Sequence, residues 1–476
     1  MQELTVEAVQ AIFGNAADFT VREIESGGNT LYAVFLDGLT SGGDIAELVI
    51  RPLCEITEPT GMAEVLDRAK RTVWCASMKS ARTPDEIAQE LVNGSCAVIF
   101  PGQQESLCFE VKTGEKRSPE APESENTVKG AKDAFTETLR TNTSLVRRHL
   151  RTSALRISAQ TVGSRTLTGV SICWIEGLTN EEYVKRMQER LSSIDIDGLL
   201  SPSAVEESVT GSRRTAFPLL QYTERTDAFC QGLLSGQVGL LADGLPLGYL
   251  APVRLAKLME SPEDRAVDYV SASCLRVLRY AALFLSLLLP ALYAAMAMYH
   301  QQMLPTKLLL AIIESKQNVP FPTILEVLGL LAAFELLQEA GLHLPQAIGT
   351  AVSIIGGLVV GTAAVEADLV SPAALIVAAA SGICGFTLPS RDLSDAIRIW
   401  RFVLTVFAGL AGLFGVTVGF ILLVIHLAGL RSLDVAYLDP FSEAKIGGAL
   451  SRPRLMLRKS GDGMPRMKNE GKQAKN

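Results

Sequence analysis

Ionisable residues inside a long apolar stretch are the strongest constraint on the fold of this chain. Residues 319–389 are almost continuously apolar, yet Glu326, Glu335, Glu339, His343 and Glu366 lie within the stretch or at its edges. Charged groups are costly in hydrocarbon, so residues of this kind line an ion or substrate path, or pair with one another inside a helix bundle. The stretch therefore predicts a membrane protein.

Hydrophobicity is concentrated in the second half of the chain. The 476 residues are 48% hydrophobic and 6% aromatic, with a mean hydropathy of +0.25. Soluble enzymes of this length spread their apolar residues along the chain, whereas here they gather after Arg279. The change in composition near residue 270 predicts a soluble α/β head followed by an all-α polytopic transmembrane domain.

The head is predicted to contain two related α/β subdomains. The segments LYAVFLDGLTSGGDIAELV from Leu31 and GVSICWIEGLTNEEYVKRM from Gly169 share a strand, a glycine turn and a helix, displaced by about 139 positions. DEIAQELVNGSCAVIF from Asp85 matches DAFCQGLLSGQVGLLA from Asp227 at about 142 positions. The two offsets indicate a duplication; the alternative is a general likeness between α/β segments.

These patterns divide the chain into five parts. We expect a first α/β subdomain at 1–113, a linker and basic helix at 114–165, a second α/β subdomain at 166–270, a transmembrane helical domain at 271–430 and a basic cytoplasmic tail at 431–476. The basic helix carries Arg147, Arg148 and Arg151, and a solvated or interface role is favoured over lipid or nucleic-acid binding.

Four apolar segments are long enough to cross a bilayer: 280–299, 347–365, 371–388 and 402–427. A fifth, 319–337, is interrupted by prolines and glutamates, and is expected to be re-entrant, interfacial or buried within an oligomer.

Basic residues give the expected orientation. Arg276 beside the first span and the basic tail from Arg452 place both ends in the cytoplasm, which requires an even number of crossings. In a four-span protein Arg391, Arg398 and Arg401 would then lie outside, against the positive-inside tendency, so the number of spans stays open.

The head is expected to lie in the cytoplasm. The start MQELTVEAVQ has glutamates where a secretory signal has a basic and then an apolar segment. Eight cysteines are scattered without a C-x-x-C pair, which indicates a reducing compartment and neither a zinc site nor a disulfide framework.

Two patterns in the membrane half are candidate functional sites. Glu335, Glu339 and His343 are spaced by four, so on one helix they share a face; the alternatives are a pore-lining or gating stripe and a surface stripe paired with arginines. Small residues also recur every four positions, and they predict close helix packing or a hydrophobic constriction. They are Gly349, Ser353, Gly357 and Gly361.

A second set of glycines, Gly409, Gly412, Gly415 and Gly419, marks the last apolar segment, and helix packing is the favoured role. The chain contains no phosphate-binding G-x-x-x-x-G-K-S/T, dinucleotide-binding G-x-G-x-x-G, H-E-x-x-H or G-x-S-x-G motif. We therefore expect no catalytic residues, cofactor or metal.

The chain resembles the A subunits of GerA-type spore germinant receptors, from LDGLTSGGDIAELVIRPL at Leu36 to YLDPFSEA at Tyr437. The most specific stretches are VPFPTILEVLGLLAAFELLQEAGLHLP from Val319 and IGTAVSIIGGLVVGTAAVEADLVSP from Ile348. The chain departs from the family pattern where arginines are usual, at Gln338 and His343, and where an Arg-Pro-Asp triplet is frequent, at Thr226.

The resemblance implies a subunit in the spore inner membrane, with a cytoplasmic head, that assembles with a transporter-like B subunit and a lipoprotein C subunit. It further implies homo-oligomers that form a ligand-gated channel releasing monovalent cations. The alternative within the family is an A-like paralogue accessory to the spore dipicolinate channel. Alternatives of other classes are a secondary transporter and a membrane scaffold; no nucleic-acid partner is expected.

Overall fold

The structure is a computed structural model that describes residues 4–14, 16–58, 60–112, 122, 125, 127, 129–211, 215–343, 361–439 and 441. Its contacts define two compact units. The α/β unit comprises residues within 1–212 and 220–252, and the helical unit comprises residues within 213–219 and 253–453.

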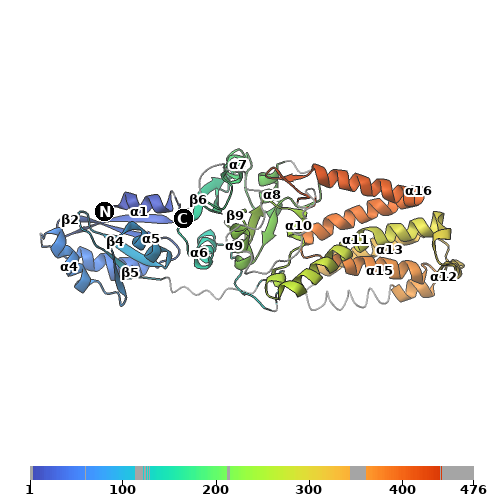
Figure 1. The fold of residues 1–476 in the computed structure, drawn as a ribbon, viewed down its shortest axis with the longest axis horizontal. Coiled ribbons are helices and arrows are strands. Elements are labelled where there is room, and N and C mark those ends of the chain that lie inside the picture. The colour runs from blue at the N-terminus through green and yellow to red at the C-terminus, as the bar shows by residue number, and fades with distance from the viewer. Residues whose placement is uncertain are drawn as a thin grey trace. The chain divides into compact units, whose positions relative to one another are not determined.

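The α/β unit contains two subdomains with the same order of elements (Figure 1). The first consists of α1 (Val6–Phe13), β1 (Phe19–Ser26), β2 (Asn29–Leu36), α2 (Gly42–Asp44), η1 (Ile45–Ile50), α3 (Arg51–Cys54), α4 (Met62–Thr72), β3 (Met78–Ala81), α5 (Pro84–Val92), β4 (Ser95–Ile99) and β5 (Ser106–Glu110). The second consists of α6 (Leu139–His149), β6 (Leu155–Val162), β7 (Thr168–Ile175), α7 (Glu181–Ser192), α8 (Pro202–Thr210), β8 (Gln221–Thr223), α9 (Thr226–Leu234), β9 (Val238–Ala242) and β10 (Gly248–Ala251).

Each subdomain is built on an antiparallel five-stranded sheet. The strand orders, β1-β2-β4-β5-β3 and β6-β7-β9-β10-β8, are equivalent position by position. Central strands pair in register, with Tyr32 opposite Ile99 in the first sheet and Ile172 opposite Leu240 in the second. The repeat predicted from the two offsets thus corresponds to two subdomains of one topology.

Helices cover both faces of the first sheet, which explains why the central strand β4 is apolar throughout. Ala97 and Ile99 pack in one cluster with α1 and α5, whereas Cys96 and Val98 pack in another with η1 and α4. A strand buried on both sides requires a continuous apolar run and not an alternating pattern. The equivalent strand β9, VGLLA, is likewise buried at every position.

Helix α6 joins the two subdomains. The Arg147 guanidinium is fully buried and donates two hydrogen bonds, 2.7 and 2.8 Å long, to the carboxylate of Asp18 in the first subdomain. Ser144 Oγ donates to the carbonyl of Gly38 at 2.8 Å, and Arg140 pairs with Asp37 at 2.5 Å. Both roles expected for the basic helix are therefore present: Arg147 is interfacial, whereas Arg148 and Arg151 are exposed.

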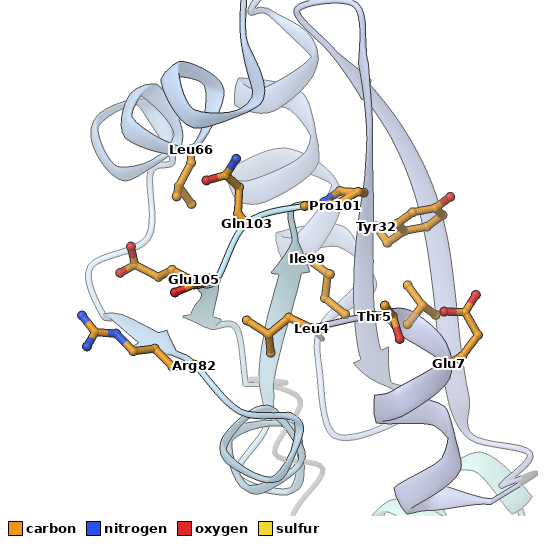
Figure 2. A pocket seen from close by; sticks show the side chains of 13 residues that line it. Leu4, Thr5, Glu7, Tyr32, Leu66, Arg82, Ile99, Pro101, Gln103 and Glu105 are labelled. Carbon is orange, nitrogen blue, oxygen red and sulfur yellow. The ribbon is translucent and has the colours of Figure 1, made fainter. Parts of the chain in front are cut away.

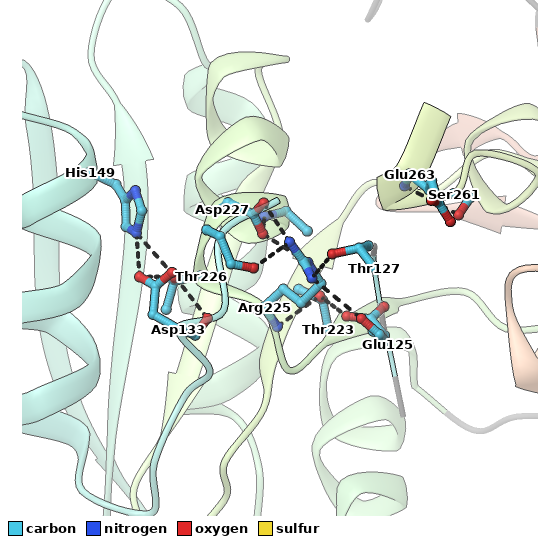
Figure 3. Close-up of polar contacts among 12 residues, drawn as sticks. Glu125, Thr127, Asp133, His149, Thr223, Arg225, Thr226, Asp227, Ser261 and Glu263 are labelled. Atoms are coloured by element: carbon cyan, nitrogen blue, oxygen red, sulfur yellow. Dashed lines mark hydrogen bonds and ion pairs between the residues drawn. The ribbon is translucent and has the colours of Figure 1, made fainter. Parts of the chain in front are cut away.

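The segment before α6 is held by a buried arginine of the second subdomain (Figure 3). Arg225 is 1% exposed; it pairs with both carboxylate oxygens of Asp227 at 2.8 and 3.0 Å, and donates to Thr127 Oγ1 at 2.8 Å and to the Ala131 carbonyl at 2.8 Å. Residues that the sequence assigns to a polar linker are thereby tied to the sheet of the second subdomain.

Thr226, which departs from the pattern that the resemblance implies, adds a further contact. Its hydroxyl donates to Asp133 Oδ2 at 2.7 Å and lies 3.1 Å from His149 Nε2, which in turn lies 2.5 Å from the same carboxylate oxygen (Figure 3). A proline has no hydroxyl and cannot supply this contact. The three side chains connect the end of α6, the preceding segment and the start of α9.

The helical unit contains α10 (Leu255–Leu258), η2 (Pro262–Arg265), α11 (Tyr269–Tyr299), η3 (Gln301–Met303), α12 (Thr306–Lys316), α13 (Thr323–His343), α15 (Pro372–Phe386), α16 (Arg391–Gly429) and the short strands β11 (Arg431–Ser432) and β12 (Val435–Ala436). Within the described ranges, α11 and α16 are long and apolar enough to cross a membrane, and α15 is a shorter apolar helix. The expected span at 347–365 lies largely outside the described residues.

Helix α16 is broken into two arms at Ala411 and Gly412, which have non-helical backbone angles. Gly412 has a φ of +60°, and the Tyr299 hydroxyl donates to the Gly409 carbonyl at 2.7 Å just before the break. An added Cβ at Gly419 would lie 2.7 Å from Leu404, a contact that requires the second arm to fold back on the first, as Figure 1 shows. The single final span expected at 402–427 is therefore a helical hairpin.

The conformation of Gly412 gives a first prediction. In Gly412→Ala, the new methyl group meets His300 at 2.9 Å and Tyr299 at 3.0 Å in a left-handed backbone conformation. We expect a loss of about 1–3 kcal/mol of stability, measured as a lower Tm of the purified protein in detergent. Gly429→Ala, where an added Cβ meets nothing within 4 Å, is the control. Equal Tm values for the two variants would contradict the strained turn.

The contact between His149 and Asp133 predicts a pH dependence. The Asp133 hydrogen bond raises the pKa of His149, and the His149 hydrogen bond lowers the pKa of Asp133 to about 2. The stabilisation is therefore complete between about pH 4 and 6.5. It is lost as pH rises through the raised pKa of His149 and as pH falls towards 2. We expect Asp133→Asn to lower Tm most at pH 5–6 and least above pH 8; the exposed Asp195→Asn should show no such profile.

Candidate gating site in the helical unit

The carboxylate of Glu335 bridges two arginines of another helix. Glu335 lies in the middle of α13; its Oε2 is 2.8 Å from Arg398 Nη1 and its Oε1 is 2.6 Å from Arg401 Nη2, both on the first arm of α16. The two arginines are three positions apart and so lie on one face of the helix. One acidic side chain thus accepts hydrogen bonds from two cations inside an apolar unit.

The same arginines extend the contact to other helices. Arg398 also donates to Gln338 Oε1 at 2.8 Å. Arg401 Nη1 donates to Ser381 Oγ of α15 at 3.1 Å, and Ser381 Oγ donates to the Ser286 carbonyl of α11 at 2.8 Å. The network therefore connects α11, α13, α15 and α16, and we call it the Glu335 network.

Burial makes the Glu335 network energetically important. Arg401 is 1% exposed, and no described group accepts a hydrogen bond from its Nε. Removing one partner of a buried ion pair leaves the other charge without compensation and costs several kcal/mol, whereas intact pairs add little net stability. The Glu335 network consequently specifies how the four helices pack more than it stabilises the unit as a whole.

Glu326 forms a second buried acidic contact, one helical turn into α13. It is 2% exposed; its Oε1 accepts hydrogen bonds from both the backbone N–H and the hydroxyl of Ser371, the N-cap of α15. Lys316 Nζ of α12 lies 3.3 Å from the other carboxylate oxygen, in an ion pair without hydrogen-bond geometry. The negative charge lies at the positive end of the α15 dipole, where it is stabilised.

A third group of charges fixes the start of α11. Asp264 is buried and accepts from Arg276 at 3.2 Å and from Arg279 at 2.7 Å. Burial alone would raise the pKa of Glu260, but Lys257, Arg276 and further cations outweigh it and lower the pKa to about 2. The arginines that the sequence indicates as flanking charges of the first span are thus paired within the protein.

The other predicted site residues are not gathered around these contacts. Glu339 and Glu366 are exposed, so Glu335 and Glu339 do not share one buried stripe. His343 ends α13, and its side chain lies outside the described residues, as do Gly349, Ser353 and Gly357. An ideal Cβ at Gly361 would be 3.5 Å from Leu375 of α15, an ordinary packing distance.

The residues that complete the site were not among the predicted set. Arg398, Arg401, Lys316 and Ser371 supply the partners of the two glutamates, and Ser381 accepts a hydrogen bond from Arg401. The signal was present for the arginines, since cations three positions apart in an apolar helix require partners. Within the described part of the chain, no three His, Cys, Asp or Glu side chains form a metal-binding group.

Substitution of Glu335 tests the energetic role of its network. Glu335→Gln removes the charge that compensates Arg398 and Arg401, and we expect a loss of about 3 kcal/mol, seen as a lower Tm in detergent. Glu339→Gln, on an exposed position one turn along the same helix, should cost less than about 1 kcal/mol. Similar Tm values for the two variants would show that the ion pairs do not hold the helices.

Comparisons with known proteins identify relatives over nearly the whole chain. The model of the family described as Bacillus/Clostridium GerA spore germination protein matches residues 7–460. Spore germination protein KA of Bacillus subtilis is 34% identical over 92% of this chain and 82% of its own length. Spore germination protein A1 of the same organism is 31% identical, with 88% of this chain and 86% of its own length covered.

Two further similarities concern the membrane and the head. The Bacillus subtilis protein YfkQ, described as an uncharacterised membrane protein, is 34% identical over 92% of this chain and 86% of its own length. Among solved structures, the N-terminal domain of the A subunit of the Bacillus megaterium germinant receptor GerK3 is 25% identical, with a TM-score of 0.40, over 52% of this chain and 92% of that one.

Proposed function

Since this chain belongs to the GerA family of spore germination proteins, we propose that it is the receptor subunit that oligomerises into a ligand-gated channel for monovalent cations. The chain would lie in the spore inner membrane with its head in the cytoplasm. Its partners would be a transporter-like B subunit, which recognises the nutrient, and a lipoprotein C subunit. Ion release would be its output, and no catalytic role is proposed.

The observation that carries the proposal is the Glu335 network. One carboxylate accepts hydrogen bonds from two arginines, and the network connects four helices. The hydrogen bonds of these polar groups are therefore made in this one arrangement of the helices. A packed interface of this kind switches between discrete arrangements and does not deform continuously. A nutrient bound to a partner subunit would open the gate only if it binds more tightly when the helices adopt a second arrangement, in which the contacts of Glu335 are changed.

Membrane insertion is supported by the surface of the helical unit. Large apolar side chains are exposed along α11, α15 and both arms of α16, including Phe284, Ile383, Leu410 and Phe414, which are 47–74% exposed. Such side chains fit contact with lipid or with further copies of the chain. Arg401 of the Glu335 network, by contrast, is 1% exposed and faces the interior of the helical unit, as expected in a membrane bundle.

Two observations favour other functions. The broken helix α16 resembles the discontinuous helices of secondary transporters, but those occur in pairs related by an internal repeat, and the repeat in this chain lies in the α/β unit. The ion pairs also suit a membrane scaffold, or an A-like paralogue accessory to the dipicolinate channel. These alternatives predict that Glu335 affects assembly alone.

The deciding measurement is nutrient-triggered potassium release from spores that carry the chain and its cognate partners. We expect release to be lost in a deletion strain and its rate to change in Glu335→Gln at equal protein level, with little change in Glu339→Gln. Normal release in the deletion strain would refute the channel. Loss of the assembled complex in Glu335→Gln, with normal release from whatever protein remains, would favour the scaffold.

A further inference from the structure

Buried polar atoms without a hydrogen-bond partner mark places where a protein has room for a further ligand. The first subdomain contains a pocket of about 940 Å³, with Glu7, Arg82 and Glu105 around it (Figure 2). None of the residues that line this pocket has a buried side-chain polar atom without a partner. The described part of the helical unit does have such atoms, among them a carboxylate oxygen of Glu326 and the hydroxyl of Tyr293.

The carboxylate of Glu326 accepts hydrogen bonds on one side only. Its Oε1 accepts from the backbone N–H and the hydroxyl of Ser371 at the start of α15, and both contacts stabilise the negative charge. Its Oε2 is buried and accepts no hydrogen bond from any described group. Because a buried charge without compensation is costly, this oxygen requires a cation next to it.

Lys316, the last residue of α12, supplies this cation. Its Nζ lies 3.3 Å from Glu326 Oε2 without hydrogen-bond geometry, and it donates a hydrogen bond to Thr323 Oγ1. The side chain of Lys316 is 19% exposed, whereas that of Glu326 is fully buried. The ammonium group therefore lies at the exposed end of the contact, and it does not use the hydrogen-bonding capacity of the carboxylate oxygen.

Helix α12 is held to the rest of the unit by few buried side chains. Within α12, which the structure describes throughout, only Ile312 is buried, in an apolar cluster that also contains Tyr293 and Ala374. Segments with few buried apolar contacts open at a low cost in free energy. A movement of α12 takes the ammonium group of Lys316 away from Glu326, and the carboxylate then needs another cation.

The groups at this site define which cation can replace the ammonium group. They offer oxygen ligands: Glu326 Oε2, Thr323 Oγ1 and, near Glu326, the Tyr293 hydroxyl, which has no described hydrogen-bond partner. One carboxylate balances one positive charge, whereas divalent cations are usually bound by several carboxylate and carbonyl oxygens. The space is that of an ammonium head group, and the potassium ion is similar in size to ammonium.

We propose that Glu326 Oε2 forms a site for a monovalent cation of the size of ammonium or potassium, and that Lys316 is a tethered occupant which such a cation displaces. Entry of the cation frees the end of α12, and its departure lets the ammonium group of Lys316 return. The role of the site rests on the proposed channel function, in which a permeating cation meets Glu326 and Lys316 keeps the site closed at rest.

Displacement is measured as acetylation of lysines by a water-soluble ester, followed by mass spectrometry, on the full-length chain in phosphatidylcholine nanodiscs. Potassium chloride is compared with tetramethylammonium chloride, whose cation is too large for the site, both at about 0.5 M so that screening is equal. We expect acetylation of Lys316 to be at least about twofold faster in potassium, because displacement exposes its amine. Lys307, exposed near the start of the same helix, is the internal control and should react equally in both salts. Equal rates for Lys316 would overturn the proposal.

Variants separate cation binding from general effects of salt. Lys316→Ala vacates the site, and we expect potassium or ammonium to raise its Tm by at least about 2 °C relative to tetramethylammonium. The double variant Lys316→Ala with Glu326→Gln lacks the charge and should show no such rise, and Lys307→Ala should behave as the wild type does. A Tm of Lys316→Ala that depends on pH but on no cation would overturn the proposal, since a proton then replaces Lys316. If Lys316→Ala does not fold, the acetylation of the wild type decides.

Cation binding is measured without ion flux, so this site and the channel can fail separately. Potassium-dependent acetylation of Lys316, together with normal potassium release from the deletion strain, would overturn the channel alone. Release that requires the chain, together with acetylation of Lys316 that is independent of the cation, would overturn the tethered-cation site alone.

Discussion

One guanidinium contacts three of the helices on which the packing of the helical unit depends, directly or through one hydroxyl group. Arg401 is almost fully buried, and it reaches α13 through Glu335 and α15 through Ser381, whose hydroxyl in turn reaches α11. A cation in such surroundings is tolerated only where its partners are fixed. Apolar burial is non-directional, whereas ion pairs and hydrogen bonds require particular partners at particular distances, so the charged contacts help to fix the register of these helices.

The α/β unit obeys a similar constraint with different residues. Its two subdomains have separate cores, and the buried pair of Arg147 and Asp18 joins them across α6. Helix α6 contacts the first subdomain at Asp18 and at the Gly38 turn, and both places lie next to strands of the sheet of that subdomain. The two subdomains are therefore joined through polar contacts at α6, while each keeps a hydrophobic core of its own.

The parts of this structure that depend on local pattern could be predicted from the sequence. The repeat was visible because the Gly-Leu-Thr turns after β2 and β7 recur at one spacing, and apolar helices were visible by length. Partners were not predictable: that Glu335 meets Arg398 follows from the rotation of two helices separated by more than 60 residues in the chain. The break at Gly412 was also not predictable, because the sequence does not distinguish a glycine that allows close helix packing from a glycine that adopts a positive φ.

The hairpin of α16 has a consequence for topology. Two arms joined by a tight turn return the chain to the side from which it entered, whatever depth the turn reaches. Arg391 at the first end and Arg431 beyond the second therefore lie at the same end of the hairpin. A hairpin adds either two crossings or none, so the number of crossings before Arg391 decides on which side of a membrane both arginines lie.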